Sequence, residues 1–189
     1  GIVGAGIPIA TGAAFASRYK EDGKVVVSFF GDAASSQGTF HEAINIGASF
    51  NLPVVYVCEN NLYGVSTYQG KVRKVADIAD RAKAYGIEGV IVDGNDVEAV
   101  KKAGEEAIAK AREGGGPTLI ECKTYRHYTH FVGEPDNYRP KEEVLEWMEK
   151  DPLKVYGERL IGQGMATKEK LDDILNEVNE EVAAAVAYA

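Results

Sequence analysis

The hydrophobic pattern of this 189-residue chain alternates repeatedly between the two-residue period of strands and the three-to-four-residue period of helices. An alternating series of this kind folds as βαβ units around a mostly parallel sheet with helices on both faces. We therefore expect an α/β fold with a doubly wound, mostly parallel sheet. The predicted helices cover residues 7–19, 36–50, 75–85 and 97–112, and the predicted strands cover residues 25–30, 54–58, 89–92 and 118–123.

The length allows one sizeable hydrophobic core and is too short for two. A stretch without usable periodicity covers residues 124–139, and helical periodicity returns after Pro140. We expect residues 1–140 to form an α/β domain and residues 141–189 to form a C-terminal helical extension of that same domain. Asn95 and Glu98 are spaced like a capping box at the start of the helix over residues 97–112.

The charge balance argues against nucleic-acid and membrane partners. Lys and Arg total 21 against 29 Asp and Glu, for a formal net charge of −8. No apolar run reaches the roughly 18 residues that a membrane-spanning helix needs. Cys58 and Cys122 have no zinc-like spacing and no disulfide framework, which favours reduced thiols in a reducing compartment.

The segment from Phe30 to Gly38 leaves a buried strand, turns through small residues and opens a helix. Unpaired N–H groups at such a helix start bind anions, and small side chains let a diphosphate approach the backbone. Asp32 would repel a bare diphosphate, so a divalent cation is expected between the two.

A second strand end supplies the matching ligand. The strand over residues 54–58 leads into Asn60 and Asn61. If the two strands are neighbours, Asp32 and Asn61 meet at the carboxyl edge of the sheet, where open α/β sheets bind ligands. Their oxygens suit Mg²⁺. Each motif alone also fits a plain turn or loop.

Gly31-Asp32-Ala33 followed by Asn60-Asn61 resembles the thiamin-diphosphate signature. The surrounding residues resemble the alpha chain of the dehydrogenase (first) component of 2-oxo acid and acetoin dehydrogenase complexes, shortened at the N-terminus. The resemblance covers roughly residues 1–150, and it implies the thiamin-diphosphate-binding fold with residues 1–140 binding the magnesium and diphosphate. The matching segments include residues 1–5, 37–43, 58–64, 92–96 and 124–139.

The resemblance implies a role for each matching position. Asp32, the Asn61 side chain and the carbonyl of Tyr63 are expected to bind Mg²⁺. Backbone groups at Ala33 and Ala34 are expected to meet the diphosphate of thiamin diphosphate.

The resemblance implies roles for four further residues, which are expected to contact other parts of the cofactor or the substrate. Gly1 and Val3 are expected to line its aminopyrimidine end. His130 matches the histidine of the family's mobile loop near the diphosphate and the reacting ring, so it is expected to bind the cofactor and to act catalytically, by orienting substrate or stabilising a developing charge. Arg126 is expected to pair with a phosphate or a substrate carboxylate, and a structural ion pair is an equal alternative.

The sequence departs from the family at three places. Ala33 replaces the second glycine of the signature, and its Cβ is expected to crowd the diphosphate or to demand an unfavourable backbone angle. Thr129 replaces the glycine before the loop histidine, and Phe131 replaces a serine that is phosphorylated in mitochondrial members. The family also has a long segment before the position of Gly1.

The implied function is that of the alpha subunit of a thiamin-diphosphate-dependent oxidoreductase acting on a 2-oxo acid of the pyruvate type or on acetoin. Its expected partners are a beta subunit in an α₂β₂ assembly and a lipoyl acyltransferase component. We expect a cytoplasmic location, or the mitochondrial matrix in a eukaryote. One alternative is a non-catalytic family member that binds cofactor poorly. A dinucleotide-binding domain is the other alternative, although residues 4–9 lack the third glycine of that motif.

Overall fold

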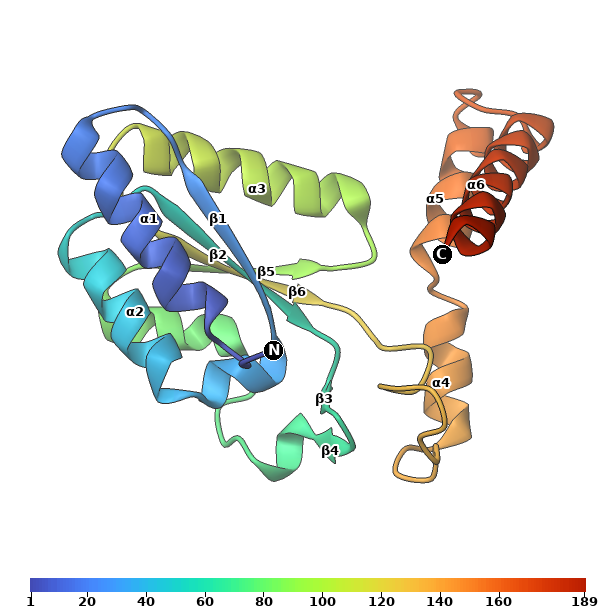
Figure 1. Ribbon diagram of the computed structural model, residues 1–189, viewed down its shortest axis with the longest axis horizontal. Helices are drawn as coiled ribbons and strands as arrows, with labels where there is room; N and C mark the ends of the chain where they lie inside the picture. The colour runs from blue at the N-terminus through green and yellow to red at the C-terminus, as the bar shows by residue number, and fades with distance from the viewer. The chain divides into compact units, whose positions relative to one another are not determined.

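Four parallel strands form the central sheet of the computed structural model, which describes residues 1–189 (Figure 1). Their order across the sheet is β1-β2-β6-β5, so β1 and β5 are the edge strands. Every pair is parallel, and the two strands that precede the predicted site, β1 and β2, are direct neighbours. The strands are β1 (Val26–Gly31), β2 (Val54–Asn60), β5 (Glu88–Asp93) and β6 (Thr118–Lys123).

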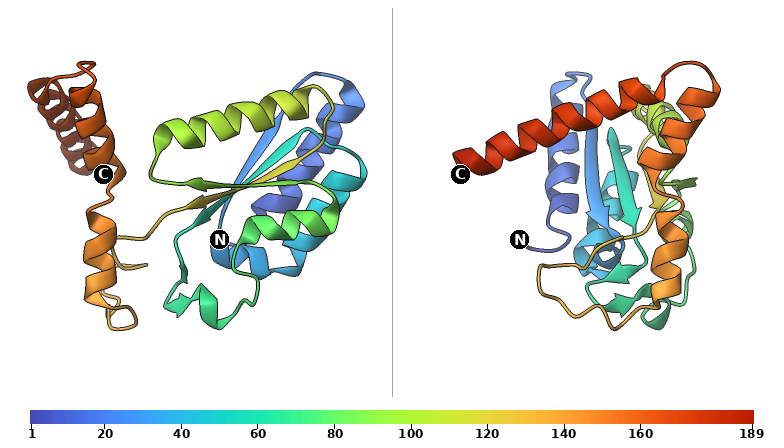
Figure 2. Two further views of the ribbon diagram at one scale, coloured as in Figure 1. Left: turned by 180° about the vertical axis from the view of Figure 1, so that it is seen from behind. Right: turned by 90° about the vertical axis from the view of Figure 1, so that its right-hand side faces the viewer.

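Helices cover both faces of this sheet (Figure 2). One core cluster lies between the sheet and the elements α1, α2 and η3, and the other lies between the sheet and α3. This arrangement confirms the expected doubly wound α/β fold. The covering elements are α1 (Gly6–Lys20), α2 (Gly38–Ser49), the 3₁₀ helix η3 (Ile78–Tyr85) and α3 (Val97–Arg112).

A tyrosine on β2 fixes how α1 and α2 pack on the sheet. Tyr56 is fully buried, and its hydroxyl lies 2.7 Å from the hydroxyl of Thr11 on α1. The same hydroxyl donates to the carbonyl of Ala43 on α2 at 3.3 Å. A Cβ added at Gly47 would lie 2.5 Å from this oxygen, so glycine is required where the helix passes over the tyrosine.

Two predicted helices differ from the observed elements. Residues 32–36 form a 3₁₀ helix, η1, and extended backbone at Gln37 delays the start of α2 to Gly38. Only residues 78–85 of the predicted 75–85 helix are helical, and they are 3₁₀. The predicted capping box is also wrong, because Asp96 is the N-cap of α3 and accepts from the backbone of Glu98 and Ala99 at 3.1 Å.

A short hairpin beyond β2 was not predicted. It consists of β3 (Tyr63–Gly64) and β4 (Thr67–Tyr68), and the 3₁₀ turn η2 (Gln69–Lys71) follows it. Two-residue strands carry no measurable periodicity, which explains why the pattern did not reveal them.

The chain divides into two units, Gly1–Trp147 and Met148–Ala189. The first includes the irregular segment 124–139 and most of α4 (Lys141–Met148). The second consists of α5 (Pro152–Gly162) and α6 (Lys168–Tyr188). No helix has both the length and the apolar character needed to cross a membrane. Both cysteines are buried and unbridged.

Candidate functional site

The carboxyl ends of β1 and β2 bring Asp32 and Asn61 to the same edge of the sheet. Gly31, the last residue of β1, pairs with Glu59 on β2. Asp32 then opens η1, and Asn61 directly follows β2. The backbone N–H of Asn61 is close enough to the Asp32 carboxylate to act to lower its pKa. The expectation that these two strand ends are adjacent is confirmed.

Asp32 is a buried carboxylate, with 4% of its surface exposed. Burial raises the pKa of this group, whereas the positive charge of Arg73 and backbone N–H groups act in the opposite direction. Burying a carboxylate costs free energy unless opposite charge or hydrogen bonds compensate it. A divalent cation beside Asp32 would supply that compensation, so the residue fits a metal ligand.

Two asparagines shape the turn after β2. The Oδ1 atom of Asn60 accepts from the N–H of Leu62 at 3.1 Å, and that of Asn61 accepts from the N–H of Tyr63 at 3.2 Å. Leu62 adopts a left-handed backbone angle with φ 73°, which side chains other than glycine rarely adopt. Strain of this kind clusters at ligand sites. The Asn61 oxygen retains a second lone pair for another partner.

The carbonyl of Tyr63 already has one hydrogen-bond donor. Arg126 contacts it through Nη1 at 3.5 Å and donates from Nη2 to the carbonyl of Val65 at 2.7 Å. A carbonyl oxygen has two lone pairs, so this contact leaves one free.

Together, Asp32, Asn61 and Tyr63 offer one carboxylate, one amide and one carbonyl oxygen, which are the hard donors that Mg²⁺ prefers. The chain has no group of three or more His, Cys, Asp or Glu residues placed to hold a metal. The oxygen donors of the candidate set suit a hard divalent cation.

Ala33 is accommodated without backbone strain. It is absent from the residues with positive φ, so the expected unfavourable backbone angle is wrong. Its Cβ faces Gly64 on β3, where an added Cβ would lie 2.8 Å away. Glycine at position 64 therefore makes room for alanine at position 33. Ala34, the next residue of η1, is 3% exposed.

A cavity of about 260 Å³ lies beside η1. One wall is formed by Asp32, Ala33 and Ser36, and the opposite wall comes from the hairpin and the turn after it. The cavity therefore adjoins the predicted diphosphate-binding segment. Its remaining lining residues are Gly64, Thr67, Gln69, Val72 and Arg73.

His130 lies exposed in the irregular segment 124–139. Its backbone N–H donates to Glu134 at 2.7 Å, and its Nδ1 atom lies 3.5 Å from Nη1 of Arg126. Arg126 also contacts the backbone of Tyr63 and Val65, so it links the loop histidine to the turn after β2. The structure gives no direct contact between His130 and Asp32.

Sequence reasoning did not identify Arg139, which organises this segment. Its guanidinium makes two hydrogen bonds to Asp136, at 2.7 and 3.0 Å, and donates to the carbonyls of Arg126 and His127. It also lies over the rings of Tyr125 and Tyr138. An arginine three residues after an aspartate gives only a weak sequence signal, because most such pairs lie on the surface.

Gly1 and Val3 lie in the segment that precedes α1. Val3 is 60% exposed. Close by, a Cβ added at Gly4 would lie 3.4 Å from side-chain atoms of Gln37 and Thr39, at the start of α2. The segment therefore packs beside the start of the helix that follows η1, although no direct contact joins Gly1 or Val3 to Asp32.

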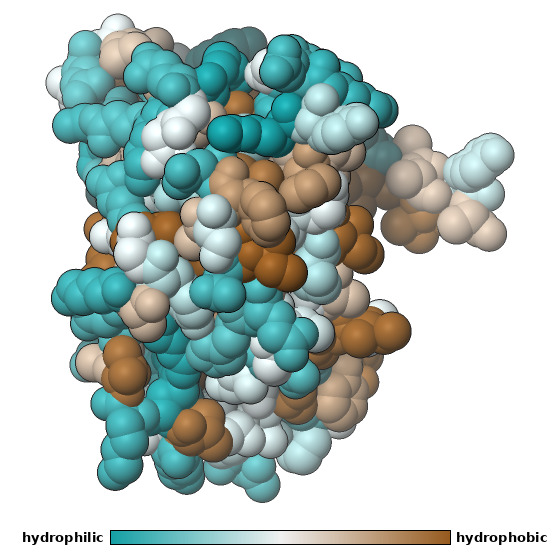
Figure 3. Space-filling model, turned by 90° about the vertical axis from the view of Figure 1, so that its left-hand side faces the viewer, coloured by the Kyte–Doolittle hydropathy of each residue, from teal (hydrophilic) through white to brown (hydrophobic).

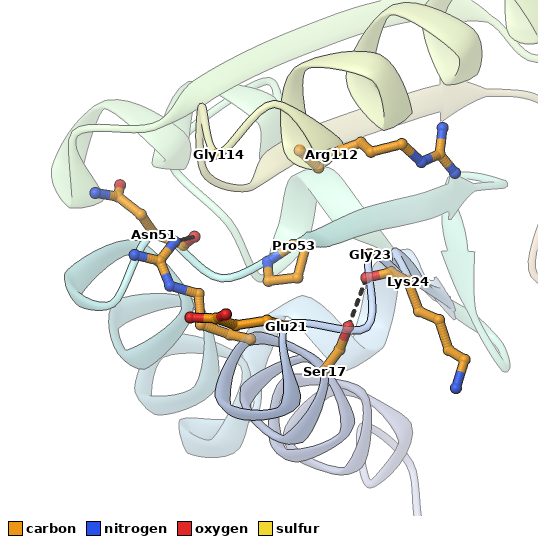
Figure 4. Close-up of a pocket in the computed structure, with 10 residues that line it drawn as sticks. Ser17, Glu21, Gly23, Lys24, Asn51, Pro53, Arg112 and Gly114 are labelled. Carbon is orange, nitrogen blue, oxygen red and sulfur yellow. Dashed lines mark hydrogen bonds between the residues drawn. The ribbon is translucent and has the colours of Figure 1, made fainter.

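A second cavity of about 350 Å³ lies at the opposite, amino-terminal edge of the sheet (Figure 4). Ser17 closes one side by donating to the carbonyl of Lys24 at 2.8 Å. The charged ends of Lys24 and Arg112 extend away from the cavity. Because ligands of parallel sheets bind at the carboxyl edge, this cavity is not the candidate site.

A third cavity, of about 290 Å³, is an apolar groove between α1 and α2. Large apolar side chains are exposed on or near it, with Ile9 71% and Phe15 46% exposed. Figure 3 shows apolar side chains gathered among polar ones on the side of the molecule where these two helices lie. Exposed apolar area of this kind is typical of surfaces that contact other chains.

The whole chain, residues 1–189, matches the family described as "Dehydrogenase E1 component". It is 48% identical over its full length to the alpha subunit of acetoin:2,6-dichlorophenolindophenol oxidoreductase from Bacillus subtilis and covers 56% of that protein. The protein of the same name from Cupriavidus necator is 45% identical, again with 56% covered. The pyruvate dehydrogenase E1 component subunit alpha of Rhizobium meliloti is 40% identical, with 55% covered.

The chain spans about half the length of these curated relatives. The match includes the two strand ends, the hairpin and the irregular segment described above. The expected resemblance is thus confirmed over the full chain, and the chain belongs to the dehydrogenase E1 component family.

Proposed function

We propose that this chain is the part of an E1 alpha subunit that binds the diphosphate of thiamin diphosphate through Mg²⁺. The observation that carries the proposal is the burial of Asp32 beside Asn61 at the carboxyl edge of two neighbouring parallel strands. A buried acid at this place needs a cation, and a diphosphate needs the same cation to approach that acid. Membership of the E1 family supports the choice of cofactor.

In this proposal Asp32, the Asn61 side chain and the Tyr63 carbonyl hold the cation. Backbone groups of Ala33 and Ala34 are assigned to the diphosphate, because these residues follow Asp32 directly in η1. Gly64 removes the side chain that would otherwise clash with Ala33. The residues present therefore fit the group.

When bound, thiamin diphosphate supplies the nucleophile and electron sink for decarboxylation or carbon–carbon cleavage. We assign His130 the task of donating a hydrogen bond to a substrate oxygen that gains negative charge. Its exposed position on a loop lets it approach a ligand, and Arg126 holds it near the turn after β2. Gly1 and Val3 are proposed to line the aminopyrimidine end.

For the substrate, we favour acetoin over a 2-oxo acid of the pyruvate type. The two acetoin-oxidising relatives are 48% and 45% identical, whereas the pyruvate dehydrogenase subunit from Rhizobium meliloti is 40% identical. The higher identity to the two acetoin-oxidising relatives supports acetoin as the substrate. Turnover of acetoin and of pyruvate by the assembled component distinguishes the two.

We further propose that the chain works with a beta subunit, in an α₂β₂ assembly that passes its product to a lipoyl acyltransferase component in the cytoplasm. The word "alpha" in the names of the relatives supports a second subunit. The exposed apolar residues Ile9 and Phe15 of α1 and Phe29, 65% exposed on the edge strand β1, offer surface for subunit contact.

Calorimetry with thiamin diphosphate tests the proposal, performed with Mg²⁺ and with a chelator, and with and without a beta chain. We expect saturable binding only when Mg²⁺ is present. Trp147 provides an independent signal, because it stacks on Tyr125 with ring centroids 5.4 Å apart at the base of the irregular segment. No saturable binding under any of these conditions would favour the alternative of a non-catalytic family member.

A further inference from the structure

Arg73 carries an unsatisfied donor in the wall of the cavity beside η1. Its Nη1 atom is buried and has no hydrogen-bond partner. The Oε1 atom of Gln69, four residues earlier, is buried and unpartnered as well. Nearly all buried polar atoms of folded proteins are hydrogen-bonded, because leaving one unpaired is unfavourable. Two such atoms in one cavity indicate a missing partner.

Both residues line the cavity of about 260 Å³ that also contains Asp32, Ala33 and Ser36. They also line a neighbouring cavity of about 200 Å³. The space beside the guanidinium is therefore large enough for a small polyatomic group, and not only for a water molecule. Because one wall is η1, a group placed there lies next to the backbone segment that we assign to the diphosphate.

The charge around this cavity favours an anion. Arg81 approaches η1 from η3 and donates to the backbone carbonyl of Ser35. Burial lowers the pKa of Arg81, and the nearby positive charge of Arg73 lowers it further. Asp32 is the acidic residue that lines the cavity, and a bound cation would neutralise it. The remaining charge is positive.

We propose that the guanidinium of Arg73 donates a hydrogen bond to an anionic oxygen of a phosphoryl group held beside η1, which makes Arg73 a binding residue for the diphosphate. The inference rests on the proposed function and extends it to a residue outside the signature. Guanidinium groups bind phosphoryl oxygens strongly because the hydrogen bonds are charge-assisted. The amide of Gln69, rotated so that its nitrogen faces the cavity, donates a second hydrogen bond to the same group.

A substrate carboxylate also presents anionic oxygens, so the experiment must distinguish the two sources. We favour the phosphoryl group because the cavity includes Ala33 and Ser36 of η1 and none of the residues of the loop that carries His130. A carboxylate reacting near that loop would lie away from Arg73.

Isothermal titration calorimetry on Arg73→Gln, Arg73→Lys and the wild-type chain, each with the beta chain present, tests the proposal. The probes are magnesium thiamin diphosphate, magnesium inorganic diphosphate, thiamin without phosphate, and pyruvate. We expect Arg73→Gln to weaken both diphosphate ligands about 10- to 100-fold, the effect of losing one charged hydrogen bond. Arg73→Lys should weaken them less, and thiamin binding should not change.

Lys74→Gln is the matched control, because Lys74 is the exposed cation next in the chain and lines neither cavity. It should bind like the wild type, and thermal melts should show that all variants are folded. Equal diphosphate affinity in Arg73→Gln and Lys74→Gln would overturn the proposal, as would a loss confined to pyruvate.

The four ligands and the variants also distinguish a failure of this inference from a failure of the proposed function. Binding of thiamin diphosphate that does not depend on Arg73 would leave the proposed function intact and remove the inference. Binding of inorganic diphosphate that depends on Arg73, without binding of thiamin diphosphate, would support the subsite and contradict the proposed cofactor. No binding of any phosphate ligand would overturn both.

Discussion

The side-chain amide of Asn60 donates a 2.6 Å hydrogen bond to the carboxylate of Glu121, and both side chains are fully buried. The pair joins β2 to its neighbour β6. The second carboxylate oxygen of Glu121 accepts from the backbone N–H of Ala79 in η3 at 2.8 Å. One buried acid thus ties two strands and a covering element together, directly before Asn61. The position of the predicted metal ligand depends on this contact.

Replacing Glu121 should therefore destabilise the protein more than an ordinary substitution does. In Glu121→Ala, the Asn60 amide and the Ala79 N–H lose their acceptors in the buried interior. Each unsatisfied buried group costs about 1–3 kcal/mol, so we expect the free energy of unfolding to fall by about 2–5 kcal/mol. Urea unfolding followed by circular dichroism measures this change.

Glu121→Gln keeps one acceptor oxygen, so its free energy of unfolding should fall by less than half as much as that of Glu121→Ala. The exposed Glu105→Ala on α3 serves as a surface control, because it removes only an exposed pair with Lys101. Equal stability of Glu121→Ala and Glu105→Ala would show that the buried pair makes no net contribution.

The contact between Ala33 and Gly64 predicts a compensating pair of substitutions. Gly64→Ala places a new Cβ 2.8 Å from that of Ala33 and should lower stability by about 1–3 kcal/mol, because two packed backbones must separate. Ala33→Gly removes the opposing Cβ, so the double variant should recover most of the loss. A double-mutant cycle by thermal unfolding measures this coupling. Additive effects of the two substitutions would contradict the contact.

Much of the sheet could be predicted from the sequence, because long elements with clear periodicity leave little choice. The helix over residues 97–112 and the strand over residues 118–123 match the structure at both ends. The adjacency of Asp32 and Asn61 followed from the rule that parallel strands place their carboxyl ends at one edge.

Contacts between segments distant in the chain could not be predicted in this way. Arg73 gave no signal, since the hairpin that places it near η1 is built from two-residue strands. The backbone angle of Ala33 was predicted incorrectly for a similar reason. The space for its side chain comes from Gly64, and no pattern within the signature indicates that pairing.

Asp32 should reduce the stability of the metal-free protein at neutral pH. Burial raises its pKa, so the folded state binds a proton more tightly than the unfolded state, and stability falls as the pH rises through the raised value. Asp32→Asn removes this cost, and we expect an equal or higher melting temperature without metal. The same variant should lose the stabilisation that Mg²⁺ with thiamin diphosphate gives the wild type.

Melting temperatures between pH 4 and 8, with and without Mg²⁺ and cofactor, measure both the stability of the metal-free protein and the stabilisation by the ligand. A ligand-induced stabilisation that persists in Asp32→Asn would exclude this carboxylate as the metal ligand. A lower melting temperature of the metal-free variant would show that Asp32 stabilises the fold.

Asp22 should stabilise the folded protein at neutral pH, whereas Asp32 should destabilise it, and the contribution of Asp22 should be lost in acid. Its carboxylate accepts from the hydroxyl of Ser17 at 2.6 Å and from the ammonium of Lys24 at 2.9 Å, and these contacts lower its pKa from 3.8 to about 2. The unfolded state therefore binds more protons in this range, and the contribution is present above pH 3.8 and lost as the pH falls through about 2. Asp22→Asn should flatten the acid limb of the stability curve. A titration of the Asp22 carboxyl carbon by NMR with an ordinary midpoint would contradict the assignment.

The guanidinium of Arg139 should determine whether segment 124–139 keeps its shape. Its side chain is fully buried, and four of its contacts hold Asp136 and the carbonyls of Arg126 and His127. The ion pair with Asp136 raises the pKa of Arg139, so the charge persists throughout the physiological range. Lysine lacks the planar fork, and its three N–H donors are fewer than the four hydrogen bonds that Arg139 makes.

We therefore expect Arg139→Lys to speed amide hydrogen exchange across residues 126–138 about tenfold or more, while exchange in β1 and β2 stays unchanged. Because Arg126 and His130 belong to this segment, the affinity for a cofactor analogue should fall together with the protection. Hydrogen exchange followed by mass spectrometry measures both regions in one experiment. Lys141→Arg, an exposed change at the start of α4, controls for the substitution itself. Unchanged protection in Arg139→Lys would mean that aromatic packing alone, and not the guanidinium, maintains the segment.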